Sequence, residues 1–282
     1  MYKTFLYGGV GNQLFQYFLL YGHTEDFETS ELFLDNYKTH NSNIKQLLNI
    51  KEVPKIALEV SVTKKIFQNI QRVMIKIFCA INLASWIGVK TDGSNNLFSN
   101  KKTDFFGYWH DLNLFEPHRQ KIIEADWAYN IRFLEANNRN DVLADNTFVL
   151  HIRKGDYLVG KNKKIFADLD AKFYIDGLAS LRGKFDKLII CTDDKGWVDH
   201  HLIDSLSCFC DNIVMSSHYG CTNWVDDFLL MRFSRNLIIS NSTFSWWAAF
   251  LNDNNVYYPR RWYINEDFDM KRNHWKDFGT PL

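Results

Sequence analysis

The sequence has no excess of either charge and very little proline. Lys plus Arg equals Asp plus Glu at 33 each in 282 residues, so the chain lacks the broad positive field with which a nucleic-acid binder attracts phosphates. We expect no nucleic-acid partner, and any bound anion must be held by local groups. Only four prolines occur, without repeats or Pro/Gly-rich tracts, so domain boundaries must come from the hydrophobic pattern.

The marks of export and of a disulfide framework are also missing. Residues 1–7 form a short apolar run without the charged region, long apolar core and cleavage site of a signal peptide, so we expect a cytoplasmic protein. Five cysteines are an odd set, and reduced thiols are the default in that compartment. Cys208 and Cys210 lie near three histidines, but their spacing is not that of a zinc knuckle, and we expect no metal.

Residues 66–89 are the most membrane-like stretch, yet Lys76 interrupts them and the uncharged part that follows is too short to span a bilayer. Apolar residues at helical spacing predict a helix instead; they are Ile66, Ile70, Val73, Ile77 and Ile81. Packing of this face into the core is the favoured interpretation. The alternative is that neighbouring Lys and Arg side chains lie against anionic lipid, a peripheral contact at the inner face of the membrane.

What the chain does have is material for a core, with 46% hydrophobic and 16% aromatic residues, in a length that suits two lobes. Its start predicts a strand at residues 4–7, a glycine turn at 8–11 and a helix from Asn12. The middle, up to about residue 140, is mostly helical in pattern. From residue 147 onward, strands at 148–152, 187–191, 212–215, 237–240 and 256–258 alternate with helices at 173–181, 225–233 and 244–251.

This alternation predicts an α/β protein in which helices cover both faces of a parallel sheet. We predict a first lobe at residues 1–140 and a second at 141–282, whose last helix is a candidate to pack back on the first lobe. Ligands bind beyond the carboxyl ends of the strands in sheets of this kind. The chemistry should therefore lie in the loops after Leu150, Ile190 and Ile239.

The glycine loop at residues 8–13 joins a strand to a helix. Gly9 and Gly11 let the backbone approach a ligand, and the helix amino terminus favours an anion or an oxygen-rich ligand, with Asn12 and Gln13 beside it. Leu14 stands where a dinucleotide fingerprint would have its third glycine, which argues against a nicotinamide cofactor. The alternative is a plain tight turn in which Asn12 caps the helix.

A second loop follows the most apolar strand. Strand alternation places His151 and Arg153 on one side, with Asp156 just past the strand end. An arginine there can grip a diphosphate and stabilise the charge that grows on it as a bond to a sugar breaks. A nearby carboxylate could take a proton from an attacking hydroxyl. The alternative is an ion pair between Arg153 and Asp156 that ties down a turn.

The third loop, residues 238–247, again leads from a strand into a helix. Ser242, Thr243 and the free amides of the helix start form a natural phosphate cradle. The tryptophans at 246 and 247 fit a core better than a sugar-stacking platform. Asp226 and Asp227 open the preceding helix and could reach a base or ribose, or simply suit a helix start.

Two adjacent carboxylates, Asp193 and Asp194, follow the strand that ends near Cys191. They suggest a metal site like that of manganese-dependent transferases. We disfavour it, because such pairs more often cap a helix or face water, and Arg153 already supplies positive charge for a diphosphate.

Four blocks of sequence together carry a family resemblance. They are GGVGNQLFQY at 8–17, GYW at 107–109, HIRKGDY at 151–157 and NSTFSWWAAFL at 241–251, with DFLLM at 227–231 before the last. In this order they resemble the inverting α-1,2-fucosyltransferases of glycosyltransferase family 11. The blocks span nearly the whole chain, whereas residues 22–100 show little likeness.

The resemblance implies a GT-B-like pair of Rossmann-type lobes with a donor cleft between them, the first lobe on the acceptor side and the second binding GDP-fucose. It further implies an inverting fucosyltransferase that needs no metal or other cofactor and makes an α-1,2 linkage to a galactoside-type glycan. Arg153 would then neutralise the β-phosphate, and Asp156 would be the base or orient Arg153. The remaining implied donor contacts are Gly9, Gly11, Asn12, Gln13, His151, Asp227, Asn241, Ser242, Thr243 and Ser245.

One position departs from the family pattern, since Lys154 stands where a second arginine is common, which keeps the charge but loses a bidentate contact. Two alternatives to the fucosyltransferase interpretation stay open: a transferase for a different nucleotide sugar, and an inactive protein that only binds carbohydrate or nucleotide sugar. A bacterial surface polysaccharide precursor made at the cytoplasmic face would suit an enzyme without an export signal.

Overall fold

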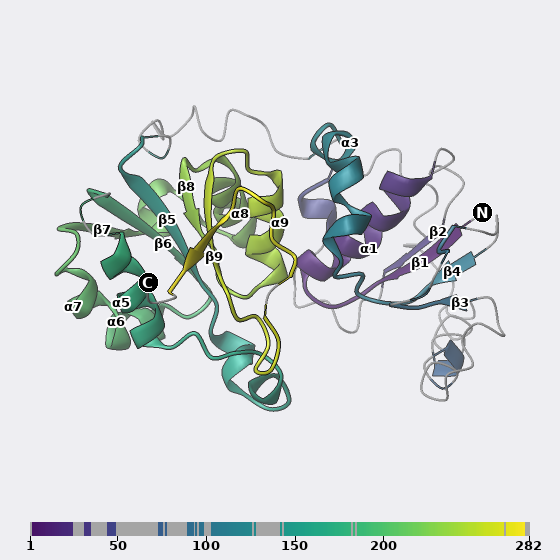
Figure 1. The fold of residues 1–282 in the computed structure, drawn as a ribbon, viewed down its shortest axis with the longest axis horizontal. Helices are drawn as coiled ribbons and strands as arrows, with labels where there is room; N and C mark the ends of the chain where they lie inside the picture. The colour runs from purple at the N-terminus through teal and green to yellow at the C-terminus, as the bar shows by residue number, and fades with distance from the viewer. Residues whose placement is uncertain are drawn as a thin grey trace. The chain divides into compact units, whose positions relative to one another are not determined.

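The chain forms two units, Met1–Ala128 and Tyr129–Leu282 (Figure 1). The computed structural model describes residues 2–24, 31–34, 44–48, 73–75, 77, 89–92, 94, 96–98, 103–125, 127, 142, 144–181, 183, 185–267 and 269–279. The boundary expected between residues 140 and 141 lies outside the described residues. The expectation of an α/β protein with two Rossmann-type lobes is confirmed, because each unit has its own parallel sheet with helices against it.

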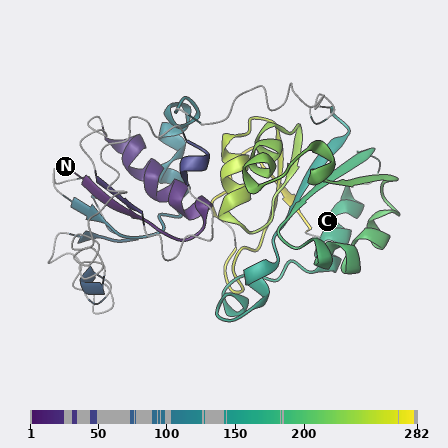
Figure 2. The same ribbon diagram turned by 180° about the vertical axis from the view of Figure 1, so that it is seen from behind.

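Unit 1 is built on a four-stranded sheet in the order β2-β1-β4-β3, in which every pairing is parallel. The strands are β1 (Tyr2–Leu6), β2 (Glu31–Leu34), β3 (Val89–Lys90) and β4 (Thr103–Phe105). Helix α1 (Val10–His23) packs on β1, and the short α3 (Arg119–Ile123) packs on α1 (Figure 2). Three 3-10 turns complete the described elements: η2 (Ile44–Gln46), η4 (Leu112–Leu114) and η5 (Glu116–His118).

Helix α1 is the core of this unit, because residues 13–20 are buried on every side of the helix. Their run of Leu, Phe and Tyr explains this, since a helix that is apolar all round is stable only inside a protein. The helix begins at Val10 with Gly9 as its N-cap. The alternative in which Asn12 caps the helix is therefore wrong.

The expectation of a mostly helical middle is also wrong for the described residues, because that stretch supplies β2, β3 and β4. Strands of two to four residues are too short to show an alternating pattern.

Of the helix expected between Ile66 and Ile81, the described residues 73–75 and 77 are helical. Val73 and Ile77 are 51% and 50% exposed while Ile75 is buried, so their expected packing in the core is wrong; the other members of that face lie outside the described residues.

Unit 2 is built on a six-stranded parallel sheet in the order β10-β9-β8-β5-β6-β7. The strands are β5 (Thr147–Ile152), β6 (Lys187–Thr192), β7 (Asn212–Met215), β8 (Asn236–Ile238), β9 (Asn255–Pro259) and β10 (Lys276–Phe278). The helices are α5 (Ala171–Ser180), α6 (Lys195–His201), α7 (Ile203–Leu206), α8 (Trp224–Phe233) and α9 (Thr243–Leu251). The 3-10 turns η7 (Gly155–Leu158), η8 (Asn162–Lys164) and η9 (Ser216–Tyr219) lie in the connections.

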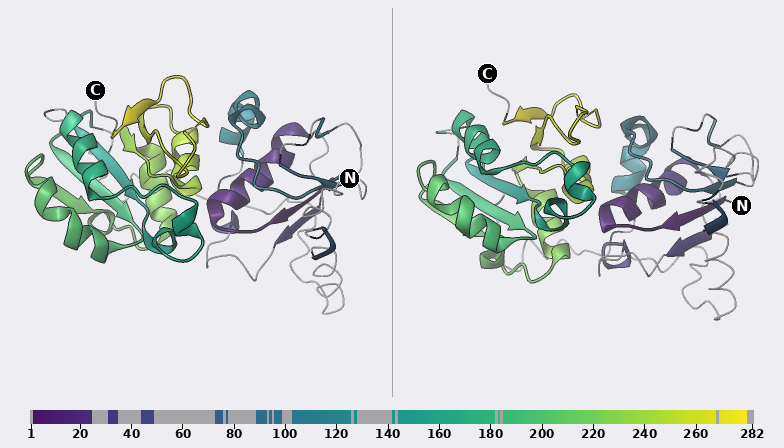
Figure 3. Two further views of the ribbon diagram at one scale, coloured as in Figure 1. Left: turned by 60° about the horizontal axis from the view of Figure 1, so that its bottom comes forward. Right: turned by 90° about the horizontal axis from the view of Figure 1, so that it is seen from below.

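Helices cover both faces of this sheet (Figure 3). One core cluster joins Phe148, Leu150 and Ile152 of β5 to Tyr174 of α5 and Val198 of α6. On the opposite face α8 and α9 pack together, and α8 contacts β5. The tryptophans at 246 and 247 are fully buried in α9, which confirms their assignment to the core.

The strand order puts a topological switch point between β5 and β8. The chain leaves β5 for β6 and β7 on one side, then crosses back to β8 and β9 on the other. Because all strands are parallel, the loops after β5 and β8 emerge side by side at the carboxyl edge and diverge there. Ligands of open α/β sheets bind at such points, so the fold favours the loops that start at residues 153 and 239.

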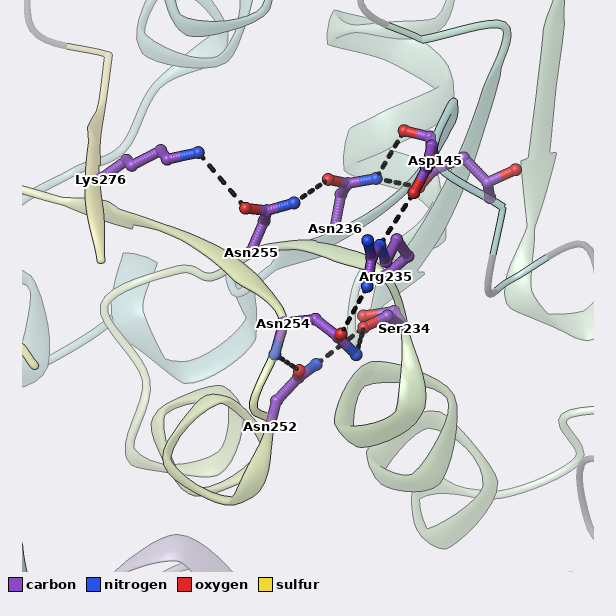
Figure 4. A network of polar contacts seen from close by, with 9 residues as sticks. Asp145, Ser234, Arg235, Asn236, Asn252, Asn254, Asn255 and Lys276 are labelled. Atoms are coloured by element: carbon purple, nitrogen blue, oxygen red, sulfur yellow. Dashed lines mark hydrogen bonds and ion pairs between the residues drawn. The ribbon is translucent and has the colours of Figure 1, made fainter. Parts of the chain in front are cut away.

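The opposite, amino edge of the sheet is closed by a network of side-chain amides (Figure 4). At its centre Asn236, which is buried at the start of β8, donates to the carbonyls of Asp145 (2.9 Å) and Thr147 (3.0 Å) and accepts from Asn255 (3.0 Å). The network continues through Lys276, Arg235, Asn254, Asn252 and Ser234. These bonds satisfy backbone carbonyls at this edge of the sheet.

Candidate functional site

Arg153 is the first residue after β5 and is held by two carboxylates. Its Nη2 lies 2.6 Å from Oδ1 of Asp156, and its Nη1 lies 2.9 Å from Oδ2 of Asp193. The side chain is 30% exposed. Burial disfavours the charged guanidinium, but Asp193 and Asp156 outweigh that effect and raise the pKa of Arg153. A guanidinium has five N–H donors, so two carboxylates can fix its plane while other donors face a ligand.

Both carboxylates pair with Arg153 and accept a second hydrogen bond. Asp156 uses Oδ1 for Arg153, and its Oδ2 accepts from Nδ2 of Asn162 at 3.0 Å. Asp193 accepts the backbone N–H of Lys154 at Oδ1, 2.9 Å away. A Cβ on Gly155 would collide with the Asp193 carboxylate, so only glycine fits between the two loops.

Asp193 is the functional residue whose role the sequence did not reveal. Its neighbour Asp194 does what the motif suggested, because it caps α6 by accepting from the Trp197 amide at 2.9 Å. Asp193 instead bridges to Arg153 because β6 lies next to β5 in the sheet. The sequence pattern could have indicated this contact, because Arg153 and Asp193 each follow a predicted strand of the same parallel sheet.

Lys154 points away from Arg153 into the protein. Its Nζ donates to Oδ1 of Asp168 (2.8 Å) and to the Leu169 carbonyl (2.6 Å), and lies 4.0 Å from the centre of the Trp197 ring. The side chain is only 2% exposed. The position that commonly carries a second arginine in the resembling family is therefore a buried tether here.

His151 is a neutral, buried group beneath the same loop. Its Nδ1 lies 2.8 Å from Oγ of Ser240, which joins β5 to the loop after β8. Burial, helped by the charge of Arg153, lowers the pKa of His151 to about 3. The Phe244 ring lies 5.7 Å away, so His151 sets the spacing between Arg153 and the start of α9.

The loop after β8 is held by its own side chains. Nδ2 of Asn241 donates to the carbonyls of Ala167 (2.8 Å) and Trp262 (3.1 Å), and Tyr157 donates its hydroxyl to the Asn241 carbonyl (3.0 Å). Ser242 is the N-cap of α9. Ser245 donates within the loop, to the Ser240 and Ser242 carbonyls.

These bonds decide what the loop can offer a ligand. The side chains of Asn241 and Ser245 are engaged inside the protein, whereas Thr243 is half-buried at the first position of α9. The first turn of a helix presents backbone N–H groups and a partial positive charge. A phosphate would meet those N–H groups and Thr243 more readily than the amide of Asn241.

Asp227 brings a different kind of group to the carboxyl edge. It lies in the first turn of α8, where Asn223 is the N-cap and Asp226 bonds to the Thr222 amide at 2.8 Å. Oδ1 of Asp227 is buried and has no hydrogen-bond partner among the described residues. Burial raises the pKa of Asp227, while the neighbouring Ser216 and Cys191 act against the rise. The Asp227 carboxyl therefore lies in a buried cluster with Ser216 and Cys191, beneath the carboxyl edge of the sheet.

The glycine loop belongs to the other unit and has its own local arrangement. Gly8 has a φ of 79°, and a Cβ there would lie 2.9 Å from Nδ2 of Asn12. Asn12 meets His110 through Oδ1 and Nε2 at 3.1 Å. Gln13 donates to the Gly8 carbonyl (3.0 Å) and accepts from the Ile44 amide (3.1 Å), so its amide holds the loop. Gly9 has open space around its α-carbon.

The structure thus brings Arg153, Asp156, His151 and the start of α9 together at one edge of unit 2, and places Gly9, Gly11, Asn12 and Gln13 in unit 1. In the described part of the chain no three His, Cys, Asp or Glu side chains are grouped so as to hold a metal. Nor does any helix there have the length and apolar character to cross a membrane. Cys191, Cys208 and Cys210 are free thiols.

Comparison with known proteins places the chain in a family. The family model described as Glycosyl transferase family 11 matches residues 1–277. The chain belongs to glycosyl transferase family 11. The resemblance carried by the four sequence blocks is thereby confirmed, and the protein is a glycosyltransferase of the fucosyltransferase type.

Curated relatives of this family 11 glycosyltransferase match along most of the chain. An alpha-1,2-colitosyltransferase of Escherichia coli is 30% identical, covering 94% of this chain and 93% of the relative. The O-antigen biosynthesis glycosyltransferase WbnK of Escherichia coli is 27% identical over 93% and 95%. A galactoside 2-alpha-L-fucosyltransferase of Caenorhabditis elegans is 25% identical over 95% and 73%. Among solved structures, POFUT1 in complex with GDP aligns with a TM-score of 0.48 and 11% identity, covering 99% and 98% of the two chains.

Proposed function

We propose that this protein transfers L-fucose from GDP-fucose to a hydroxyl of a galactoside-type glycan, forming an α-1,2 linkage with inversion and without a metal ion. The observation that carries the proposal is the guanidinium of Arg153, fixed by Asp156 and Asp193 at the switch point of the unit 2 sheet. The family resemblance supports the donor. The name of the Caenorhabditis elegans relative supports the linkage and the acceptor class.

In this mechanism Arg153 binds the β-phosphate of the donor. The bond from the anomeric carbon to the β-phosphate oxygen breaks and its electrons stay on GDP, where Arg153 meets the growing charge. The acceptor oxygen forms the new bond on the opposite face of the sugar, which inverts the anomeric centre, and the proton of the acceptor hydroxyl is released to water. Arg153 and its two carboxylates sum to one negative charge, so the N–H groups at the start of α9 must also contribute.

Asp156 is better placed to orient Arg153 than to take the acceptor proton. Both of its oxygens already accept hydrogen bonds, from Arg153 and from Asn162. A dissociative path, in which the donor bond is largely broken before the acceptor attacks, needs little help from a base. We therefore assign Asp156 as a positioning residue.

The proposal that no metal takes part rests on the use of the carboxylates. Asp193, the residue that a manganese site after β6 would need, accepts from Arg153 and from the Lys154 amide. Asp194 is the N-cap of α6. Arg153 and the helix start supply the positive groups that a metal provides in other transferases.

The test is release of GDP from GDP-fucose by the purified protein, with and without a β-galactoside and with a strong chelator present. Acceptor-dependent release in chelator supports the donor, the transfer and metal independence, and NMR of the product then gives the linkage and the anomeric configuration. Loss of activity in chelator that manganese restores would overturn metal independence. Binding of GDP-fucose without product across a panel of acceptors would make the protein a binding protein, and no binding would overturn the donor.

A second candidate donor is a nucleotide-linked colitose. The 30% identity with an alpha-1,2-colitosyltransferase favours it as directly as the Caenorhabditis elegans relative favours fucose. Colitose is fucose without the 3-hydroxyl, so a pocket that hydrogen-bonds this hydroxyl would reject colitose strongly, whereas an apolar pocket would discriminate weakly. Comparing kcat/KM for the GDP derivatives of the two sugars decides between them.

A further inference from the structure

The turn at residues 107–109 in unit 1 is held unusually tightly. It follows β4, and Asp92 follows β3, so both lie at the carboxyl edge of that sheet. Oδ2 of Asp92 accepts the Tyr108 amide at 2.9 Å, and Oδ1 accepts the Trp109 amide at 2.6 Å. A Cβ on Gly107 would lie 2.6 Å from Oδ1 of Asp92, so only glycine allows this approach.

The same turn contains a strained backbone. Trp109 has a φ of 61°, in the left-handed region that bulky residues avoid. Such a conformation is unfavourable and persists only where the surroundings enforce it. Trp109 is itself buried, so the strain and the two Asp92 bonds together fix the direction of the residue between Gly107 and Trp109.

That residue is Tyr108, which is 41% exposed. Its ring lies 5.0 Å from the ring of Tyr7 and stacks on His110 with centroids 5.5 Å apart. Tyr7 in turn stacks on Phe106 at 5.3 Å. The exposed ring therefore belongs to an aromatic row that also contains Phe106, Tyr7 and His110.

The position of the row connects it with the glycine loop. Tyr7 follows β1 and Phe106 follows β4, which are adjacent parallel strands. His110, which supports Tyr108, contacts Asn12 of the glycine loop at 3.1 Å. Polar groups that could bond sugar hydroxyls thus lie next to an aromatic face. A single exposed aromatic residue needs no explanation, but a loose surface tyrosine would need neither the glycine nor the strain.

We propose that Tyr108 is the platform on which a pyranose ring of the acceptor stacks, with Asp92 as its positioning residue. The inference rests on the proposed function, in which the acceptor is a galactoside. A β-galactoside has an axial 4-hydroxyl, which leaves three C–H groups on the opposite face of the ring. Those C–H groups match the negative face of an aromatic ring, and an aromatic face beside a few polar groups is typical of a small-molecule site.

The test compares Tyr108→Phe, Tyr108→Leu and Tyr108→Ala with the wild type. Phenylalanine keeps the ring, leucine keeps apolar area without a π face, and alanine removes both. We expect the leucine and alanine variants to raise the KM for lactose about tenfold, which corresponds to about 1.4 kcal/mol, with Tyr108→Phe unchanged. The Kd for GDP-fucose and its slow hydrolysis without acceptor should not change.

Two results overturn the inference: an unchanged lactose KM in Tyr108→Ala, or an equal loss of GDP-fucose affinity, which would mean that the ring stacks on the nucleotide. Asp92→Asn tests the positioning role, because it should raise the lactose KM with the tyrosine still present, and added to Tyr108→Ala it should raise the KM no further than Tyr108→Ala alone. An unchanged lactose KM in Asp92→Asn overturns that role.

Failure of the proposed function would be recognised separately. If the wild type transfers no sugar, saturation-transfer NMR with methyl β-galactoside still tests Tyr108 directly. Binding that is lost in Tyr108→Ala and kept in Tyr108→Phe supports the platform. Binding that survives in Tyr108→Ala, or no binding to the wild type, overturns it.

Discussion

Nη1 of Arg153 lies 2.9 Å from Oδ2 of Asp193, and this contact joins the loops that follow β5 and β6. The backbone N–H of Lys154 holds Asp193, and Asp193 in turn orients the guanidinium of Arg153. The direction of the guanidinium is therefore set by the pairing of β5 with β6. Such fixed donors cost little reorganisation when charge develops on a leaving group.

We expect Asp193→Asn to lower kcat by about tenfold to a hundredfold, which corresponds to roughly 1.4–2.7 kcal/mol in the barrier. Asparagine can still accept the Lys154 amide but cannot balance the charge of Arg153. Arg153→Ala should abolish transfer while the protein stays folded. Steady-state kinetics with GDP-fucose, and circular dichroism of both variants, provide the measurement.

The matched control is Asp194→Asn, one residue along. Asn and Asp are equally good N-caps, so this variant should keep near-normal kcat. The positioning role also predicts strong non-additivity: Asp193→Asn combined with Arg153→Lys, which keeps a positive charge, should lower kcat by less than the two separate losses combined. Additive losses would show that Asp193 acts independently of Arg153.

Lys154→Met should destabilise the fold and spare the donor site. The buried carbonyl of Leu169 would lose its partner, at a cost of about 1–3 kcal/mol, whereas Asp168 is exposed enough to be solvated. The bond to Asp193 comes from the backbone N–H of Lys154, so it survives the change. Urea unfolding should show the loss, and GDP-fucose titration should give a Kd close to that of the wild type.

An exposed lysine serves as the comparison for that prediction. Lys172 pairs with Asp176 on the surface of α5, so Lys172→Met should leave the unfolding midpoint nearly unchanged. A large loss of donor affinity in Lys154→Met, with stability intact, would instead place the ammonium of Lys154 at the donor.

His151 should make stability depend on pH. Its pKa is about 3 in the folded protein, below the value of about 6.5 in an unfolded chain. The unfolded state therefore binds more protons between these values, and the stability gained from the neutral ring is complete above about pH 6.5 and is lost as the pH falls toward 3. We expect the free energy of unfolding to fall with pH more steeply in the wild type than in His151→Asn.

The measurement is urea unfolding of both proteins at pH 7, 6 and 5. One proton corresponds to about 1.4 kcal/mol per pH unit. The difference in the free energy of unfolding between wild type and variant should therefore shrink as the pH falls from 7 to 5. His110, whose pKa burial lowers to about 4, is present in both proteins and cancels in the comparison. A gap that stays constant with pH would mean that His151 is not held neutral.

Regular elements with long patterns could be predicted from the sequence. The strand expected at 148–152 is β5 (Thr147–Ile152), the one expected at 212–215 is β7 (Asn212–Met215), and the last helix differs by one residue at its start. These segments are apolar over four or more residues, which is enough to read a period. The strands β2, β3 and β4 of unit 1 are too short to show a period, and they are strands only because they pair with neighbouring strands.

The sequence predicted which residues form the candidate site, but not which side chains they contact. Arg153 and Asp156 are three residues apart, so their ion pair was one of the foreseen alternatives. Asp193 joins them only because β6 pairs with β5, and strand order is a tertiary property. The reversed direction of Lys154 has the same cause, since Asp168 and Trp197 come from other elements.

Asn236→Ala should destabilise unit 2 from the edge opposite the site. The change leaves the carbonyl of Asp145, the buried carbonyl of Thr147 and the side-chain amide of Asn255 without their bonds (Figure 4). Each lost bond costs about 0.5–1.5 kcal/mol, so we expect a loss of several kcal/mol in urea unfolding. Because Arg153 lies at the other end of β5, the kcat of the folded fraction should be unchanged at low temperature. A fall in kcat without a fall in stability would mean that the two edges of the sheet are coupled.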